Sequence, residues 1–209
     1  MAKVLFINPV IREEDAPKHI PYGMALLGAI AMKHGHQIQV YDANAHRAGF
    51  ELLAQVCKAD DWEVIAIGGL TTAYGYIKKA CRIARKTSPR ALIVAGGGFI
   101  ISMPHEVMQW IPEIDLGIIG EAFLTFPEIL KKWDQKEPDF ENVLGVCYRR
   151  GDGTTQLSQV RPNISHLDDL PYPAWELFPL NIYFENSALR HFDPVLPHHK
   201  YDEDPWDTF

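Results

Sequence analysis

Short apolar runs that end at turn-forming residues alternate with segments of helical periodicity through most of the chain. This alternation constrains the fold more than any other feature, because each run suits a strand that helices cover. The expected strands cover residues 3–7, 37–41, 64–67, 91–95 and 116–119. The expected helices cover residues 21–33, 50–58, 74–86, 105–110 and 122–133. Strand–helix units in series predict a parallel sheet, since right-handed crossovers leave few other topologies.

The expected fold class is a three-layer α/β domain of the flavodoxin-like, or Rossmann-like, type. Its strands, numbered in chain order, are expected to lie in the order 2-1-3-4-5, with helices on both faces of the sheet. A chain of 209 residues is long enough for one such domain, which we place at residues 1–137.

The pattern of the chain changes after this domain. We expect residues 138–160 to form a small antiparallel hairpin that is an appendage to the sheet. Frequent prolines in residues 161–209 are expected to interrupt every regular element, which predicts a linker that ends in an acidic tail. The two hairpin strands are expected at residues 143–149 and 154–160, joined by a turn at Asp152-Gly153.

The charge balance argues against nucleic-acid binding. The chain has 20 Lys and Arg against 27 Asp and Glu, a net charge of -7, and no basic cluster that could follow a phosphate backbone. No stretch approaches the roughly 20 apolar residues that cross a bilayer, and the chain begins with a strand pattern rather than a signal peptide. We therefore expect a cytoplasmic protein without nucleic-acid or membrane partners.

No metal site is expected from the cysteines or histidines. Cys57, Cys81 and Cys147 lie far apart in the sequence, so we interpret them as buried thiols rather than ligands of zinc or of an iron–sulfur cluster. Other potential ligands gather in the proline-rich tail, where a solvated segment is expected because no rigid scaffold would orient them. These tail residues are His191, Asp193, His198, His199 and Asp202.

The loops that follow the strands are the candidate ligand-binding positions. In an open parallel sheet, ligands bind at the carboxyl ends of the strands, near the point where the strand order reverses. Glycine in such a loop lets the backbone approach a bulky ligand, although it can also serve only a tight turn. The candidates are Asn8 and Pro9 after the first strand, Gly68, Gly69, Leu70, Thr71 and Thr72 after the third, Gly96, Gly97, Gly98 and Phe99 after the fourth, and Gly120 and Glu121 after the fifth.

The common nucleotide-binding motifs are missing from these loops. No glycine lies between the first strand and Gly23, so the Gly-x-Gly-x-x-Gly motif of dinucleotide sites is absent. No Gly-Lys-Ser or Gly-Lys-Thr triplet occurs either, which excludes the usual P-loop. Dinucleotide binding and P-loop chemistry are therefore disfavoured.

Several segments, taken in order, resemble one known family. They are KVLFINP at 3–9, PYGMALLGAIAMKHGHQIQVYDA at 21–43, IAIGGLTT at 65–72, IVAGGGF at 93–99, IDLGIIGEAFLTFPEIL at 114–130, VLGVCYRRGDG at 143–153 and LDDLPYPAWELFPL at 167–180. In this order and spacing, the chain resembles the N-terminal cobalamin-binding domain of cobalamin-dependent radical S-adenosylmethionine (SAM) enzymes. The resemblance adds Tyr22 and Gly23 to the candidate cofactor-binding residues.

The resemblance implies a module that binds cobalamin (vitamin B12) with no protein histidine beneath the cobalt. The corrin amides would meet the loops after the first, third, fourth and fifth strands, and the nucleotide tail would enter the sheet edge. The radical enzymes carry Cys-x-x-x-Cys-x-x-Cys after the linker, whereas no cysteine follows Cys147 here. We therefore expect no iron–sulfur cluster and no catalysis by this chain alone. A separate radical SAM subunit or a C-terminal domain would supply the reaction, such as a methylation.

The alternative is a cofactor-free domain that acts as an interaction or regulatory subunit. Family members usually have Gly-Gly-Pro-His where this chain has Gly97-Gly98-Phe99-Ile100, and Gly-Glu-Gly-Glu where it has Gly-Glu-Ala-Phe at residues 120–123. The Phe99 ring could stack on a flat macrocycle or occupy the space that the macrocycle needs. The sequence leaves both alternatives open.

A second motif is similar to a known cobalt-ligating one. Asn44-Ala45-His46-Arg47-Ala48-Gly49 imitates Asp-x-His-x-x-Gly, whose histidine ligates cobalt in other cobalamin proteins. That motif belongs after the first strand, whereas His46 follows the second, and Asn44 replaces the aspartate that would orient the imidazole. We therefore expect His46 to be an exposed loop residue rather than a cobalt ligand.

Overall fold

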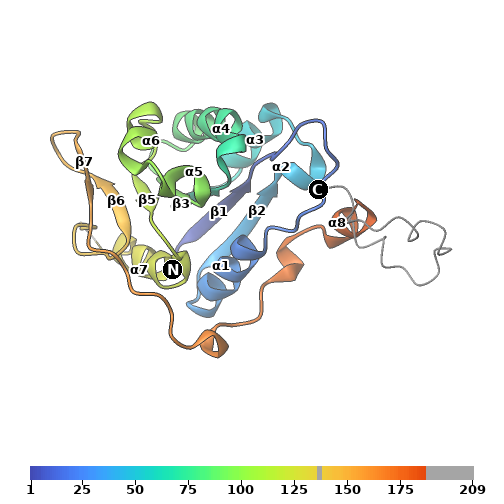
Figure 1. Cartoon of the computed structure of the whole chain (residues 1–209). Helices are drawn as coiled ribbons and strands as arrows, with labels where there is room; N and C mark the ends of the chain where they lie inside the picture. Colours follow the sequence, from blue (N-terminus) through green and yellow to red (C-terminus); the bar gives the residue numbers. More distant parts are fainter. Residues whose placement is uncertain (136–137, 187–209) are drawn as a thin grey trace, which may run out of the picture.

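The computed structural model describes residues 1–135 and 138–186. At its centre is a seven-stranded sheet in the order β2-β1-β3-β4-β5-β6-β7 (Figure 1). β1 to β5 are parallel and β6 and β7 antiparallel, so the predicted α/β fold class and the order of its parallel strands are confirmed. The strands are β1 (Lys3–Asn8), β2 (Gln37–Asp42), β3 (Val64–Gly68), β4 (Leu92–Gly96), β5 (Leu116–Ile118), β6 (Val146–Arg149) and β7 (Thr155–Leu157).

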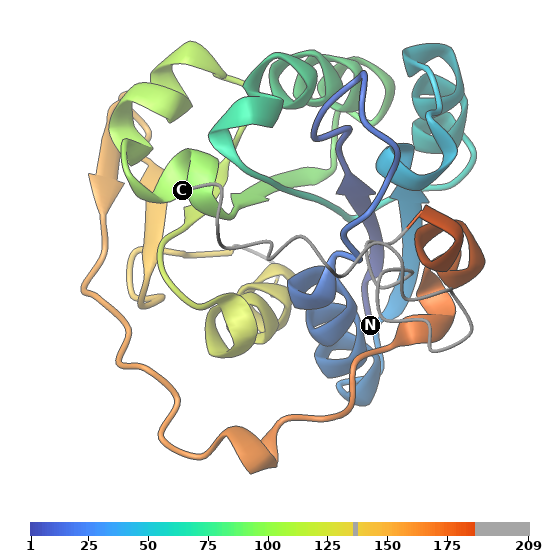
Figure 2. The same ribbon diagram turned by 45° about the vertical axis from the view of Figure 1, so that its right-hand side comes forward.

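Helices cover both faces of the parallel part of the sheet (Figures 1 and 2). One face packs against α1 (Tyr22–Lys33) and α7 (Ala122–Trp133). The other packs against α3 (Phe50–Lys58), α4 (Tyr74–Thr87) and α6 (Pro104–Trp110). These helices begin and end within one residue of the predicted positions. Three further short elements were not predicted, and they are α2 (Ala43–His46), the 3-10 turn η1 (Thr71–Ala73) and α5 (Gly98–Ile101).

Alternate side chains of β1 enter two separate cores. Leu5 and Ile7 belong to the core beneath α3 and α4, whereas Val4 and Phe6 belong to the core beneath α1 and α7. All four side chains are buried. Because both faces of the strand are covered, its sequence is a continuous apolar run rather than an alternation of apolar and polar residues.

The predicted hairpin extends the sheet at its β5 edge. β6 pairs antiparallel with β5 and with β7, so the hairpin is continuous with the main sheet. Both hairpin strands are shorter than expected. Gly153 has a φ of +84°, which fits the prediction that the Asp-Gly pair supplies the positive φ of the turn.

The segment after the hairpin passes α7 and α1 and returns to the β2 side of the molecule (Figures 1 and 2). Along this path the Ala174 N–H donates to the Ala25 carbonyl at 3.0 Å, and Phe178 and Tyr183 are buried. The prediction that prolines interrupt every regular element is wrong for residues 180–186, which form a helix. Pro179 directly precedes a helix, where a proline is tolerated because the first helical N–H groups need no partner within the helix. The segment contains η2 (Leu167–Asp169), η3 (Trp175–Leu177) and α8 (Leu180–Asn186).

The expectations about membrane partners and about the acidic tail concern the helices and the C-terminal residues. Within residues 1–135 and 138–186, no helix has the length and apolar character needed to span a bilayer. The acidic tail lies outside the described residues, and with it His191, Asp193, His198, His199 and Asp202.

Candidate functional site

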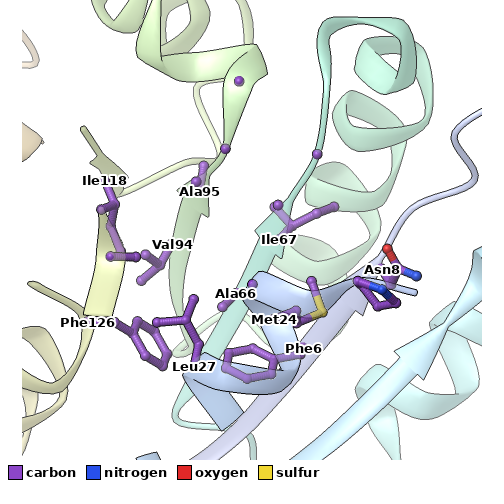
Figure 3. A pocket seen from close by; sticks show the side chains of 18 of the residues that line it. Phe6, Asn8, Met24, Leu27, Ala66, Ile67, Val94, Ala95, Ile118 and Phe126 are labelled. Atoms are coloured by element: carbon purple, nitrogen blue, oxygen red, sulfur yellow. The ribbon is translucent and has the colours of Figure 1, made fainter. Parts of the chain in front are cut away.

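A cavity of about 530 Å³ opens at the carboxyl ends of β1, β3, β4 and β5, between the sheet and helices α1 and α7 (Figure 3). Its volume lies within the usual range for ligand pockets, and its place is the one that the parallel topology predicts. Figure 3 shows Phe6, Leu27 and Phe126 gathered at one end of the cavity, with Asn8 at another. The Phe6 and Phe126 rings lie 5.5 Å apart. The cavity is therefore mostly apolar, with a polar group at its rim.

Small residues in the central strands create the open space. Ala66 pairs with Val94, and Gly68 pairs with Gly96 two residues further along β3 and β4. A Cβ added at Gly96 would meet no atom within 4 Å, and one at Gly68 would lie 3.5 Å from the Gly96 carbonyl oxygen. Since residues two apart point to the same face of a strand, Ala66 and Gly68 leave room on the face that α1 and α7 cover.

Most of the sequence-predicted site residues line this cavity. The ends of four strands, β1, β3, β4 and β5, supply most of these residues, and the start of α1 supplies an aromatic ring and a glycine. The predicted residues that line the cavity are Asn8, Pro9, Tyr22, Gly23, Gly68, Gly69, Leu70, Gly96, Gly97, Gly98, Gly120 and Glu121.

Three predicted site residues lie elsewhere. Thr71 and Thr72 are exposed on η1 and do not line the cavity. Phe99 is only 4% exposed and packs in the core beneath α3 and α4, on the opposite side of the sheet from the cavity. The Phe99 ring therefore neither stacks over the cavity nor fills it.

The glycine loops after β3 and β4 are joined to each other. The Gly69 N–H donates to the Gly96 carbonyl at 3.3 Å, and the Phe99 N–H donates to the Gly69 carbonyl at 3.2 Å. Gly97 has a φ of +88°, and a Cβ there would lie 2.7 Å from the Gly69 carbonyl oxygen. Gly97 therefore serves the close approach of two loops, whereas Gly96 leaves space for a ligand. A glycine that makes room for a ligand is therefore found at Gly96, and a glycine that the loop conformation itself requires is found at Gly97.

The deeper wall of the cavity was missed by sequence reasoning. Its residues lie inside strands and helices, where a pattern of apolar residues predicts burial but not an open volume beside it. One usable signal was the alanine and glycine on the same face of β3, in a strand whose other residues are large. The main missed residues are Phe6, Met24, Leu27, Ala66, Val94, Ile118 and Phe126.

Asn8 is held at the cavity by a buried polar cluster. Its Nδ2 atom donates to Asp42 Oδ1 at 2.7 Å and to the Tyr183 hydroxyl at 3.1 Å. The Tyr183 hydroxyl in turn donates to Asp42 Oδ2 at 2.7 Å. Burial and the neighbouring Asp42 carboxylate raise the pKa of Tyr183, so this hydroxyl stays protonated. Asp42 also caps α2 by accepting from the Ala45 N–H at 2.9 Å.

The motif around His46 has a structural role in this chain. Asn44 Oδ1 accepts from the Ile11 N–H at 3.2 Å, and the Arg47 guanidinium donates to the carbonyls of Arg12 and Asp15. These hydrogen bonds hold the loop between β1 and α1 against the segment around α2. His46 itself is exposed, and no group of three potential metal ligands converges within the described residues.

The three cysteines are buried, and their burial disfavours the thiolate form. Burial raises the pKa of Cys57 and Cys147 to about 11 and that of Cys81 to about 12. All three are unpaired, and each comes from a different element. A thiol with so high a pKa is a poor nucleophile and a poor metal ligand near neutral pH.

Comparisons with known proteins identify the family of this chain. Residues 9–130, more than half of the chain, match the B12 binding domain family. An uncharacterized methyltransferase of Pyrococcus horikoshii is 27% identical over 187 residues, which cover 87% of this chain and 40% of that protein. The cobalamin-dependent radical SAM methyltransferase TokK of Streptomyces tokunonensis is 28% identical over 89 residues, which cover 43% of this chain and 13% of that protein.

A solved structure shares the fold. The cobalamin-dependent S-adenosylmethionine radical enzyme OxsB, with aqua-cobalamin and S-adenosylmethionine bound, aligns with a TM-score of 0.73 at 14% identity. The alignment covers 88% of this chain and 25% of OxsB. This chain thus spans about two fifths of the first curated relative and a quarter of OxsB. The predicted resemblance is confirmed, and the chain belongs to the B12-binding domain family.

Proposed function

We propose that this chain holds a cobalamin at the cavity, with the nucleotide tail inside it and the corrin edge over the surrounding loops. The observation that carries the proposal is the open space beside Gly96 at the carboxyl ends of the parallel strands. The tail of cobalamin ends in a flat, apolar base, which suits walls formed by Phe6, Leu27 and Phe126. When bound, cobalamin supplies a cobalt atom that can carry a methyl group.

The residues at the mouth of the cavity are suited to the amide-bearing edge of a corrin. Asn8 offers a side-chain amide, and the loops after β3, β4 and β5 bring backbone groups close to the opening. Glu121 lies at the same mouth, where its carboxylate can accept hydrogen bonds from ligand amides. Backbone and amide contacts of this kind hold a ligand by shape rather than by metal ligation.

The proposal includes no protein ligand to the cobalt. His46 is exposed at the end of α2, after β2, whereas the cavity is formed by the ends of the other parallel strands. Its neighbours Asn44 and Arg47 hold the preceding loop. The chain therefore offers no oriented imidazole at this cavity within the described residues.

We further propose that catalysis needs a radical SAM partner, either a separate subunit or a further domain. This chain spans about two fifths of the Pyrococcus horikoshii methyltransferase, and its sequence lacks the Cys-x-x-x-Cys-x-x-Cys motif. The proposed process is a methylation, because the Pyrococcus horikoshii protein and TokK are both described as methyltransferases. The cofactor-free alternative rested on the altered loops at residues 97–100 and 120–123. The Phe99 ring is buried away from the cavity, so it does not take the space of a ligand, whereas Ala122 and Phe123 do line the cavity.

The experiment that tests cobalamin binding is direct. The purified chain is incubated with hydroxocobalamin, desalted and examined by absorbance. We expect the cobalamin spectrum to co-elute with the protein at close to one equivalent. A colourless protein after desalting, with no affinity in equilibrium titration, would reject the proposed function and favour the cofactor-free alternative.

A further inference from the structure

We infer that Tyr183 and Asp42 are positioning residues that orient the Asn8 amide, so that Asn8 Oδ1 serves as a fixed acceptor for an N–H group of the ligand. The inference rests on the proposed function and extends it. It names the chemistry that Asn8 recognises, and it makes a residue of α8 part of the cofactor site.

The orientation of the Asn8 amide follows from its two partners. Asn8 Nδ2 lies 2.7 Å from Asp42 Oδ1, and a carboxylate oxygen can only accept a hydrogen bond. If the amide were flipped, Asn8 Oδ1 would face this carboxylate oxygen with no hydrogen between them. The nitrogen must therefore face Asp42, which leaves the oxygen on the other branch of the amide.

Tyr183 makes this orientation unique. Its hydroxyl has one hydrogen, which it donates to Asp42 Oδ2, so towards Asn8 it can act only as an acceptor. Asn8 Nδ2 thus uses both of its hydrogens within the cluster. Asn8, Asp42 and Tyr183 are 5%, 4% and 0% exposed, so water competes little for these contacts.

The remaining atom of the amide is the one with a role in binding. Among residues 1–135 and 138–186, no donor contacts Asn8 Oδ1, although Asn8 is nine-tenths buried and lines the cavity. Asn8 Oδ1 is not among the fully buried side-chain atoms that lack a partner, so the atom is accessible and a ligand N–H in the cavity could donate to it in place of water. The periphery of cobalamin carries primary amides, whose NH₂ groups are donors of this kind. A carboxylate at the same place would meet Asn8 Oδ1 with a lone pair instead of a hydrogen.

The first experiment compares two tyrosine-to-phenylalanine variants by hydroxocobalamin titration. Tyr183→Phe removes the hydroxyl that orients Asn8, and we expect the dissociation constant to rise by about three- to tenfold. Tyr148→Phe is the matched control, because the Tyr148 hydroxyl is also buried but has no hydrogen-bond partner in the described structure and lies outside the cavity. We expect this control to bind like the wild type.

The second experiment tests the chemistry of recognition and does not depend on the fold of the Tyr183 variant. Monocarboxylate derivatives of cobalamin, each with one peripheral amide hydrolysed, are titrated into the wild type and into Asn8→Ala. We expect the wild type to bind at least one derivative more weakly than cobalamin, and Asn8→Ala to lose that discrimination. A structural role alone would change stability without changing this ratio.

The outcomes separate the two proposals. If the wild type binds no hydroxocobalamin, the proposed function fails and this inference fails with it. If the wild type binds but discriminates against none of the derivatives, the assignment of Asn8 Oδ1 is wrong although the proposed function stands. If Tyr183→Phe folds and binds as tightly as Tyr148→Phe, Tyr183 does not position the amide.

Discussion

At the scale of single residues, adjacent glycines in one loop have different roles. A Cβ at Gly97 would lie 2.7 Å from the Gly69 carbonyl, and its φ of +88° is strained for any other residue, so a substitution there perturbs the fold. A Cβ at Gly96 would enter open space in the cavity. Gly96 is therefore the position at which ligand binding can be tested without disturbing the two joined loops.

We predict that Gly96→Leu blocks cobalamin binding while the protein stays folded. An isobutyl group at Gly96 would occupy the cavity, and the loss of about 1.4 kcal/mol of binding free energy already corresponds to a tenfold weaker affinity. Gly151→Leu is the matched control, since a Cβ there also meets nothing within 4 Å but lies in the hairpin turn. Hydroxocobalamin titration and thermal unfolding of both variants are the measurements. Tight binding by Gly96→Leu would contradict the proposed site.

We predict that His36 makes stability depend on pH below neutrality. His36 Nδ1 accepts from the Ala2 N–H at 3.0 Å, and burial lowers the pKa of this imidazole below its ordinary value. Between pH 6.5 and the lower folded-state pKa, the unfolded chain binds more protons than the folded chain, so the free energy of unfolding falls as the pH falls. The contribution of the neutral His36 imidazole to the free energy of unfolding is fully present above pH 6.5.

The measurement for His36 is urea unfolding across this pH range. His36→Asn keeps a neutral acceptor near the Nδ1 position, so we expect it to show a smaller decline of stability with falling pH. His19→Asn changes an exposed histidine that is not among the groups that shift the pKa of His36, and it is expected to keep the wild-type slope. Equal slopes for wild type and His36→Asn would show that another group causes the decline.

At the scale of elements, the sequence predicted those whose patterns are long enough to be periodic. The helix at 50–58 was predicted without error, because its apolar residues recur at helical spacing. The short helices α2 and α5 were missed because four residues form barely one turn and carry no period. α8 was missed because the prolines around it were taken to exclude any helix.

The site was predicted only as far as its loops. The glycines that follow the strands led to the prediction of Gly68, Gly96 and Gly120, which line the cavity, because turn chemistry is local in sequence. The wall at Phe6 and Phe126 and the contact of Tyr183 with Asn8 depend on the packing of distant segments. A single sequence contains no local pattern for such contacts.

We predict that the segment before α8 contributes to stability as a packed element. Phe178 is 6% exposed, and Phe178→Ala is expected to lower the free energy of unfolding by about 3 kcal/mol through lost burial and the resulting cavity. Tyr172→Ala is the matched control, because Tyr172 is 95% exposed and its loss is expected to change stability by less than about 0.5 kcal/mol. Urea unfolding of both variants measures the two free energies of unfolding. Similar stabilities would mean that the segment is only loosely attached.

At the scale of the whole molecule, the segment after the hairpin connects two distant parts of the sheet. Arg161 donates to Thr125 Oγ1 at 2.7 Å, pairs with Glu128 on α7, and donates to the Leu144 carbonyl just before β6. Tyr183 contacts Asp42 at the end of β2, the opposite edge strand. Cavity, sheet and returning segment therefore form one body, and ligand binding at the cavity is expected to stabilise all of it.

The cysteines provide a probe of that global stabilisation. Cys57, Cys81 and Cys147 are at most 1% exposed, and each has a pKa raised to about 11 or 12, so alkylation in the native state requires that the core opens. All three belong to the same core, beneath α3 and α4. We predict negligible reaction with iodoacetamide at pH 8 in the native protein and full modification of all three thiols in urea.

Bound cobalamin should slow this alkylation, because a ligand that binds only the folded state stabilises it by RT ln(1 + [L]/Kd). At a cyanocobalamin concentration of about 100 times the dissociation constant, this amounts to about 2.7 kcal/mol, or roughly 100-fold slower modification when global opening limits access. Mass spectrometry of samples quenched over time measures the rate at each cysteine. The Gly96→Leu variant is the control and is expected to show no protection at the same concentration. Equal protection of this variant and the wild type would place the ligand outside the cavity, whereas rapid labelling of the unliganded wild type would contradict the burial of the thiols.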